Sequence, residues 1–260
     1  MSTRPKIILY DLETTHNLLA AFRLLNDDMI PFDNIVQERY IVCAAWKELD
    51  KSRVHSVSTL DHPARYAKNP HDDYHVCKVL HAMIDDADIL VAHNGDDYDL
   101  KFLEGRLIAH GFPPLAPTTT IDTLKVARRQ FLFNSNRLDY LGKYLGVGRK
   151  TKTEPGLWMR VLNGEKAAVR AMVRYNKGDV LLLEAVFKKL RPFMAHYPHL
   201  ALWDPSHIAT TCPRCGSGRS RSKGLHRALT RIYQRRICLK CGGHFRNIKA
   251  EAGGTPTRVI

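Results

Sequence analysis

The segment IILYDLETT, residues 7–15, places two acidic side chains at the end of an apolar run. The run predicts a buried strand over about residues 6–13. Because side chains alternate along a strand, Asp11 and Glu13 share one face and Leu12 points to the other. Two carboxylates on one face of a buried strand repel each other unless a cation lies between them, and hard divalent cations prefer carboxylate oxygens. Two solvated acids at a strand end is the alternative that this segment alone leaves open.

Two later segments carry further acidic side chains in ordered contexts. LVAHNGDDYDLKFL, residues 90–103, reads as a strand running into a helix, with Asp99 near the helix start. Tyr175 and Asp179 lie four residues apart within a helical stretch, so they share one helix face. The chain therefore offers four acids from three distant segments for a single site.

These segments resemble the DEDD exonuclease superfamily, in its tyrosine-containing (DEDDy) form, which has a ribonuclease-H-like fold. The matching motifs are Asp-x-Glu at Asp11 and Glu13, Asn-x-x-x-aromatic-Asp at Asn94, Tyr98 and Asp99, and Tyr-x-x-x-Asp at Tyr175 and Asp179. The wording of the second motif is most similar to the exonuclease domain of family B DNA polymerases. The resemblance covers roughly residues 5–190. His16 departs from it, since the family often carries glycine after the two threonines.

The order of predicted elements agrees with this fold class. Strands are expected at about 6–13, 36–47, 53–58, 88–93 and 118–121, and helices at about 73–86, 97–110, 123–129, 137–146 and 164–190. Residues 59–73 are predicted to form a loop, and Asp72 or Asp73 is expected to cap the helix at about 73–86. Asp122 is expected to cap the helix at about 123–129. With the resemblance, the pattern predicts an α/β domain with a mixed five-stranded sheet of order 3-2-1-4-5 flanked by helices.

The length and charge distribution predict a second, smaller unit. At 260 residues the chain holds one full domain and a small additional one. Of the net charge of +14, residues 206–260 carry +11, from twelve Lys/Arg and one acid, which is typical of nucleic-acid binding. We expect an exonuclease domain at 1–205, a zinc-ribbon nucleic-acid-binding domain at 206–250 and a flexible tail at 251–260.

Four of the six cysteines form two Cys-x-x-Cys pairs within the basic unit: Cys212, Cys215, Cys238 and Cys241. Their spacing suits one structural Zn²⁺ held by four thiolates. A disulfide framework or a dithiol redox pair is the alternative, and His226 and His244 lie outside the knuckle spacing. The isolated Cys43 and Cys77 are expected to be buried small side chains.

The resemblance implies two Mg²⁺ or Mn²⁺ ions held by the four acids Asp11, Glu13, Asp99 and Asp179, which suits an all-oxygen site. It also implies that Tyr175 orients the attacking water and that 5′-mononucleotides leave from a 3′ end. Single-stranded DNA is expected beside the site. Its predicted contacts are Leu12, Thr14 and Asn94, with the cationic and aromatic segments 128–137 and 150–158, of which Arg128, Arg129 and Arg137 are the candidate phosphate contacts. For Phe131 and Phe133 core packing is equally consistent.

The sequence thus predicts a metal-dependent 3′–5′ exodeoxyribonuclease acting on single-stranded DNA or DNA 3′ ends. A DNA polymerase or another replication protein is a possible partner, and a phage origin is plausible. An exoribonuclease, a structure-specific DNA nuclease and a non-catalytic zinc-ribbon protein are the alternatives, because a fold does not determine a function. No apolar run reaches membrane-spanning length and no signal peptide is visible, so we expect no membrane partner and a cytoplasmic setting, in the host if phage-encoded.

Overall fold

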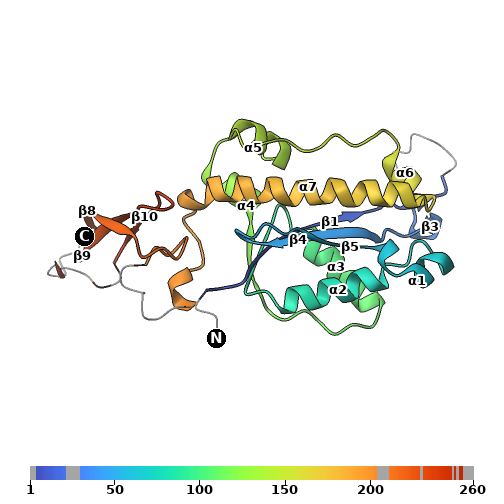
Figure 1. Cartoon of the computed structure of the whole chain (residues 1–260), viewed down its shortest axis with the longest axis horizontal. Helices are drawn as coiled ribbons and strands as arrows, with labels where there is room; N and C mark the ends of the chain where they lie inside the picture. Colours follow the sequence, from blue (N-terminus) through green and yellow to red (C-terminus); the bar gives the residue numbers. More distant parts are fainter. Residues whose placement is uncertain are drawn as a thin grey trace.

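The computed structural model describes residues 4–21, 30–203, 211–228, 231–247, 249 and 252–253. It contains a large α/β unit and a small β unit that lies beyond the end of the longest helix (Figure 1). No helix of these described stretches combines the length and apolarity that crossing a bilayer requires.

The central sheet has the strand order predicted from the sequence. It runs β5-β4-β1-β6-β7. The strands are β1 (Ile7–Thr14), β4 (Ile41–Glu48), β5 (His55–Ser58), β6 (Ile89–Ala92) and β7 (Thr119–Asp122). β1 is antiparallel to β4 and parallel to β6, which continues parallel into β7. The predicted mixed five-stranded sheet is therefore confirmed.

Helices cover both faces of this sheet (Figure 1). Helix α7 (Lys166–Leu190) crosses one face, while α2 (Tyr74–Asp85) and α3 (Asp99–Ala109) lie on the other. The remaining helical segments are η1 (Phe32–Asn34), η2 (Thr59–Asp61), α1 (Pro63–Lys68), α4 (Thr123–Gln130), α5 (Leu138–Tyr144), α6 (Leu157–Leu162), η3 (Arg191–Phe193) and η4 (Leu200–Trp203).

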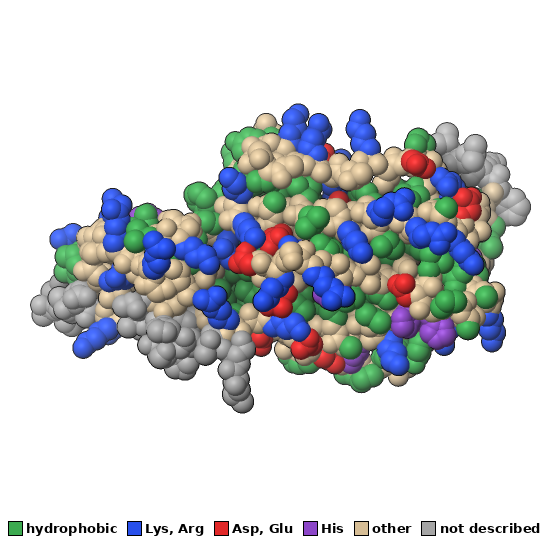
Figure 2. Space-filling view, in the orientation of Figure 1, with side chains coloured by type: hydrophobic (Ala, Val, Ile, Leu, Met, Phe, Trp, Pro, Cys, Tyr) green, Lys and Arg blue, Asp and Glu red, His purple; other side chains and the backbone are tan. Residues whose placement is uncertain are grey.

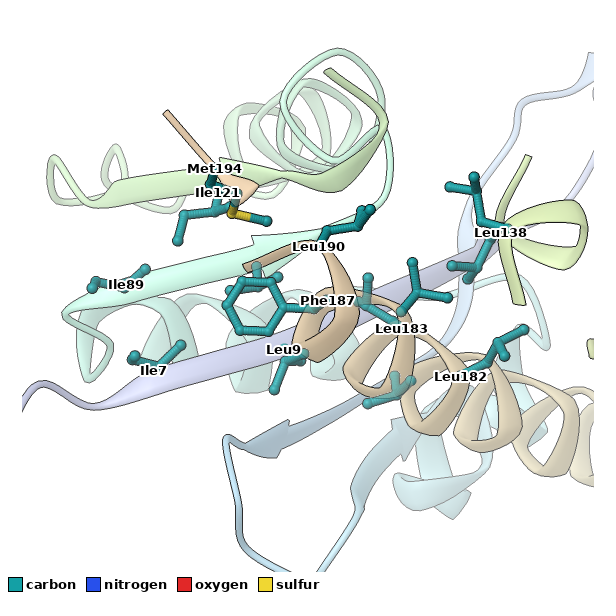
Figure 3. Packing of buried hydrophobic residues seen from close by; sticks show 14 of the residues in the cluster. Ile7, Leu9, Ile89, Ile121, Leu138, Leu182, Leu183, Phe187, Leu190 and Met194 are labelled. Atoms are coloured by element: carbon teal, nitrogen blue, oxygen red, sulfur yellow. The ribbon is translucent and has the colours of Figure 1, made fainter. Parts of the chain in front are cut away.

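The alternation of β1 assigns its side chains to two cores. Ile7 and Leu9 pack with Phe187 and Leu190 of α7 in one cluster (Figure 3). Ile8, Tyr10 and Leu12 pack on the opposite face against α2 and α3. The odd-numbered positions of β1 therefore face α7, and this row continues into the acids at positions 11 and 13.

Two predicted segments differ from the structure. The strand expected over 36–47 is interrupted, because β3 (Ile35–Gln37) pairs with β2 (Leu18–Leu19) and only β4 enters the central sheet. The loop expected over 59–73 contains η2 and α1, the latter beginning at Pro63, where proline suits the first helical turn. Apolar periodicity is too short in these segments to distinguish one turn of helix or a strand break from irregular chain.

The caps expected from the acids are partly confirmed. The carboxylate of Asp122 accepts hydrogen bonds from the amides of Leu124 and Lys125 at the start of α4. Asp73 occupies the cap position of α2, but its fully buried carboxylate binds Arg106 of α3 and His110, which directly follows α3, instead. Asp72 accepts the amide hydrogen bond of Tyr74. Packing of α3 on α2 thus diverts Asp73 from the cap to an ion pair between the helices.

The small unit is built on β9 (Arg231–Cys238), which pairs with β8 (Ser220–Arg227), β10 (His244–Arg246) and β11 (Ala252–Gly253). Two residues of the predicted flexible tail thus belong to a strand pair, and the rest of the tail lies outside the described residues. The expected boundary near 205 lies outside them as well. The unit contacts the large one through the Leu200 amide, which donates to the carbonyl of Pro213, and Arg214, whose Nε donates to the carbonyl of Met194.

Candidate functional site

Three of the four predicted metal-binding acids meet where β1 passes under α7. Asp11, Glu13 and Asp179 each present a carboxylate oxygen, and these atoms lie within 4.8 Å of one another. The β1 alternation directs the first two toward α7, whose turn around Asp179 lies opposite them. Asp179 is 1% exposed, which separates this site from a solvated acidic patch.

Burial raises the pKa of every acid in this group, and the charges of neighbouring carboxylates add to this effect at Asp11 and Glu13. Burial raises the pKa of Glu13 to about 8, with a further contribution from Asp179. The pKa of Asp11 is raised by burial and then by the charges of Asp99 and Glu13. Burial also raises the pKa of Asp179, although Lys150 opposes it. The group therefore favours bound protons or cations, as expected of carboxylates arranged for a metal.

Asp99 lies beside this group rather than within it. It is the first residue of α3, and its carboxylate accepts a hydrogen bond of 3.1 Å from the amide of Leu12. Burial raises its pKa to about 6, despite this hydrogen bond. Its charge is the largest electrostatic contribution to the raised pKa of Asp11, so the two carboxylates are neighbours. The four predicted acids thus form one electrostatic unit, with three in a tight cluster.

Among the residues that the structure describes, Lys150 is the cation paired with this cluster. Its Nζ lies 2.6 Å from Asp179 Oδ2 and 3.3 Å from the Tyr175 hydroxyl. The sequence placed Lys150 in a cationic segment for DNA but did not connect it to the acids. No local pattern does so, because Lys150 and Asp179 are 29 residues apart and meet only when the loop before α6 folds over α7.

Asn176 is a second contributor that the motifs missed. It is fully buried, and its Nδ2 donates a 2.6 Å hydrogen bond to Asp11 Oδ2. A signal existed: position 176 continues the apolar stripe of α7 through Val169, Val173 and Val180, where a polar side chain needs an explanation. Asn176 holds the Asp11 carboxylate in place against α7.

The aromatic neighbours of the acids form a short row. Trp158 of α6 lies edge-on to Tyr175, with ring centroids 6.5 Å apart, and His16 lies 6.2 Å from Trp158. His16, the residue that departs from the family motif, therefore lies at the rim of this row. Burial and the charge of Asp179 raise the pKa of Tyr175 to about 12, so Tyr175 keeps its proton and can donate a hydrogen bond at neutral pH.

A groove of about 580 Å³ is connected to the acids through Lys150 and is lined by several predicted DNA contacts. Asn94, Arg128, Arg137 and Lys150 line it. The backbone of Asn94 has a φ of 74°, and its amide donates to the carboxylate of Asp122, which fixes this turn at the groove. The groove thus places the cationic side chains of Arg128 and Arg137 beside Lys150, the cation that contacts the acidic cluster.

The other predicted contacts are placed differently. The Thr14 hydroxyl is 2.7 Å from the hydroxyl of Tyr98, which links the first and second motifs. Leu12 is buried on the opposite face of the sheet among residues of α2 and α3, so its side chain packs in the core. Arg129 is exposed and does not line the groove. Phe131 and Phe133 stack on each other and pack against the core on the α7 side.

The four predicted zinc ligands converge in the small unit. The Sγ atoms of Cys212 and Cys241 are 3.7 Å apart, and those of Cys215 and Cys238 are 3.6 Å apart. Four sulfurs around Zn²⁺ at about 2.3 Å lie about 3.8 Å from one another, far more than the length of a disulfide. All four cysteines are free, and the isolated Cys43 and Cys77 are buried as expected.

His93, beside the groove, provides a pH-dependent prediction. Burial lowers its pKa to about 4, although Asp122 opposes this, and its Nδ1 lies 2.9 Å from the Thr123 hydroxyl. The unfolded chain therefore takes up the proton first as the pH falls from about 6.5 to 4, so acid favours unfolding. We expect His93→Gln to reduce the loss of unfolding free energy between pH 7 and 5 by on the order of 1–2 kcal/mol.

Chemical denaturation at both pH values measures this difference. His196→Gln, at an exposed position, is the matched control. An identical loss of stability in the parent protein and in His93→Gln would contradict the assignment.

Known proteins share this architecture. A family model described as the RNase_H superfamily matches residues 51–191. The DNA polymerase III of PolC type from Ureaplasma parvum is 43% identical over 58 residues, which are 22% of this chain and 4% of that protein. The family B DNA polymerase from Pyrobaculum calidifontis has a TM-score of 0.53 and 18% identity over 73% of this chain and 25% of its own. The chain therefore spans a quarter or less of each polymerase, and the second similarity concerns the fold.

Proposed function

The chain belongs to the RNase_H superfamily, and from this premise we propose that it is a metal-dependent 3′–5′ exonuclease that hydrolyses single-stranded DNA. The observation that carries the proposal is the cluster of half-buried Asp11 and Glu13 with buried Asp179, and Asp99 beside it. Buried carboxylates that repel one another are costly for stability, and this fold retains them where a groove lined by cations begins.

The acidic cluster suits divalent cations such as Mg²⁺ or Mn²⁺. Asp179 Oδ1 is buried without a hydrogen-bond partner among the described residues, and the pKa values of Asp11 and Asp179 stay raised even with Lys150 beside them, which favours further positive charge at this cluster. The residues that would hold the cations are Asp11, Glu13, Asp99 and Asp179. When bound, such ions lower the pKa of an attacking water and offset charge on the departing oxygen.

The protein's own residues would position the reactants. Asn94, Arg128 and Arg137 would hold the strand along the groove, with phosphate oxygens facing the cations. Tyr175 keeps its proton and would donate a hydrogen bond that orients the water or the scissile phosphate. Lys150 already lies between Tyr175 and Asp179, and its ammonium would meet the negative charge of the phosphate.

One experiment tests the reaction, its direction and its substrate. The protein is incubated with Mg²⁺ or Mn²⁺ and with end-labelled single-stranded DNA, duplex DNA or RNA, and the products are resolved by length. We expect a ladder shortening from the 3′ end of single-stranded DNA, with 5′-mononucleotides released. Internal fragments would indicate an endonuclease, and preferential loss of RNA would indicate an exoribonuclease.

A prediction for Tyr175 separates orientation from metal binding. Tyr175→Phe removes only the hydroxyl, so α7 and the acids stay in place. We expect turnover to fall about 10- to 100-fold, as for a group that positions a proton or a water. Single-turnover rates at saturating metal measure this. A loss as large as that of an acid variant would show that Tyr175 does more than orient.

We further propose that the small unit is a zinc ribbon that binds nucleic acid. The four thiols lie at the separation that a tetrahedral ion requires, and their proximity raises the pKa of Cys215, first through its hydrogen bond to Cys212. A bound cation would lower the pKa of these thiols, because it stabilises their thiolate forms. β8 and β9 carry an excess of Lys and Arg, visible on the surface of the ribbon (Figure 2).

A further inference from the structure

We propose a phosphate-binding site at the junction of the two units, which holds a backbone phosphate of the nucleic-acid strand away from the acidic cluster. The site is a cavity of about 580 Å³ bounded by the start of β1, the turn after β4, the end of α7 and the cysteine knuckles. This proposal rests on the proposed function only because it names a nucleic-acid strand as the ligand. A second cavity of about 860 Å³ continues from it along the ribbon and shares Arg4, Asp50, Arg191 and Lys240.

Two buried donors in this cavity have no hydrogen-bond partner among the described residues. Arg191 is 9% exposed and its Nε is unpaired, although its guanidinium lies over the ring of Phe187 and interacts with the Tyr197 hydroxyl. Thr211 is 4% exposed and its hydroxyl is unpaired. A buried donor without a partner destabilises the fold, so a guanidinium Nε and a hydroxyl on residues that line one cavity point to a ligand that accepts hydrogen bonds.

The charge of the cavity favours an anionic ligand. Its charged lining residues are Arg4, Lys51, Arg191 and Lys240 against Glu48 and Asp50. Asp50 is already paired with Lys188 at 2.7 Å, which lowers its pKa, so its charge is compensated within the protein. Lys188, Lys189 and Arg214 extend the cationic lining into the second cavity. A phosphate offers several acceptors to a guanidinium, a hydroxyl and an ammonium at once.

The position of the cavity favours a strand over a free ion. Arg191 follows Asp179 by twelve residues along α7 and its continuation, which is roughly 18 Å at 1.5 Å per helical residue. Cations from both units line the cavity: Arg191 from the nuclease unit and Lys240 from the ribbon. Lys and Arg side chains continue from this junction along the ribbon in Figure 2. A strand that reaches the acids could therefore be held on both units.

Binding of a labelled single-stranded oligonucleotide tests the site. The full chain carries Asp11→Asn to suppress cleavage, and no chelator is added, so the ribbon keeps its metal. In this background we expect Thr211→Val to weaken affinity about tenfold, the effect of one hydrogen bond to a charged group. We expect Lys240→Gln to weaken it and to reduce the salt slope by about 0.7. Lys78→Gln, an exposed lysine on α2 across the sheet, is the matched control.

The stability of Thr211→Val adds an independent readout. Its hydroxyl has no partner among the described residues, so without ligand the melting temperature should stay equal or rise, which excludes misfolding as the cause of weaker binding. Unchanged affinity in both variants would overturn the proposal. So would stabilisation of the parent by millimolar inorganic phosphate with no change of DNA affinity in the variants, which would assign the site to free phosphate. Cleavage of a trinucleotide, too short to span the two sites, tests the nuclease separately.

Discussion

Asp11→Asn is expected to reduce nuclease turnover by on the order of 10³-fold or more, because removing one carboxylate disables the metal-binding cluster. Asp11 is the central acid: the charges of Asp99, Glu13 and Asp179 all raise its pKa. The neutral side chain has the same shape, and its carbonyl oxygen can still accept the hydrogen bond from Asn176. Initial rates with Mg²⁺ on single-stranded DNA measure the loss.

Stability distinguishes a functional acid from a structural one in this experiment. Removing a half-buried charge that is repelled by three others should leave the metal-free variant as stable as the parent, or more stable, at pH 8. A structural acid would lower the melting temperature when replaced. Near-normal cleavage by Asp11→Asn, or by Asp179→Ala tested in parallel, would refute the assignment of the site.

The second large effect is expected from Cys238→Ser. Cys238 is 1% exposed and lies at the end of β9, the central strand of the ribbon sheet. The ribbon buries few apolar side chains, so a metal held by four thiolates would contribute most of its folding free energy. We expect zinc content to fall from about one ion per chain to near zero, and the ribbon to become sensitive to protease.

The large α/β unit should stay folded when the ribbon loses its metal. The α/β unit has its own cores, so cleavage of short oligonucleotides should survive in Cys238→Ser, while affinity for long DNA and its salt dependence should decrease. Cys77→Ser, a buried cysteine outside the ribbon, is the control for cysteine loss as such. A parent protein that contains no zinc would refute the assignment of the four cysteines as zinc ligands. An unchanged salt slope in Cys238→Ser would show that the folded ribbon does not contribute to DNA binding.

The predictions that the structure confirms rest on patterns within single segments. The alternation of residues 7–13 fixes which side chains of β1 face α7, and the periodicity of 166–190 fixes the core face of α7. The spacing of the three motifs indicated the resemblance, and the resemblance predicted the strand order and the superfamily. Both predictions are confirmed. The predictions for residues 36–47 and 59–73 were wrong, because the elements within these segments are short and lack a sustained apolar period.

Sequence alone determined the strand alternation, the helix faces, the two Cys-x-x-Cys pairs and the concentration of positive charge in the C-terminal unit, because each depends on residues close together in the chain. Only the tertiary structure decided that Lys150 contacts Asp179 and that Asn176 binds Asp11. It also decided that the side chain of Asp73 binds Arg106 instead of capping α2. It also decided that Arg191 and Thr211 share a cavity. These pairs are separated along the chain by loops whose course no local propensity specifies, and packing of whole elements brings them together.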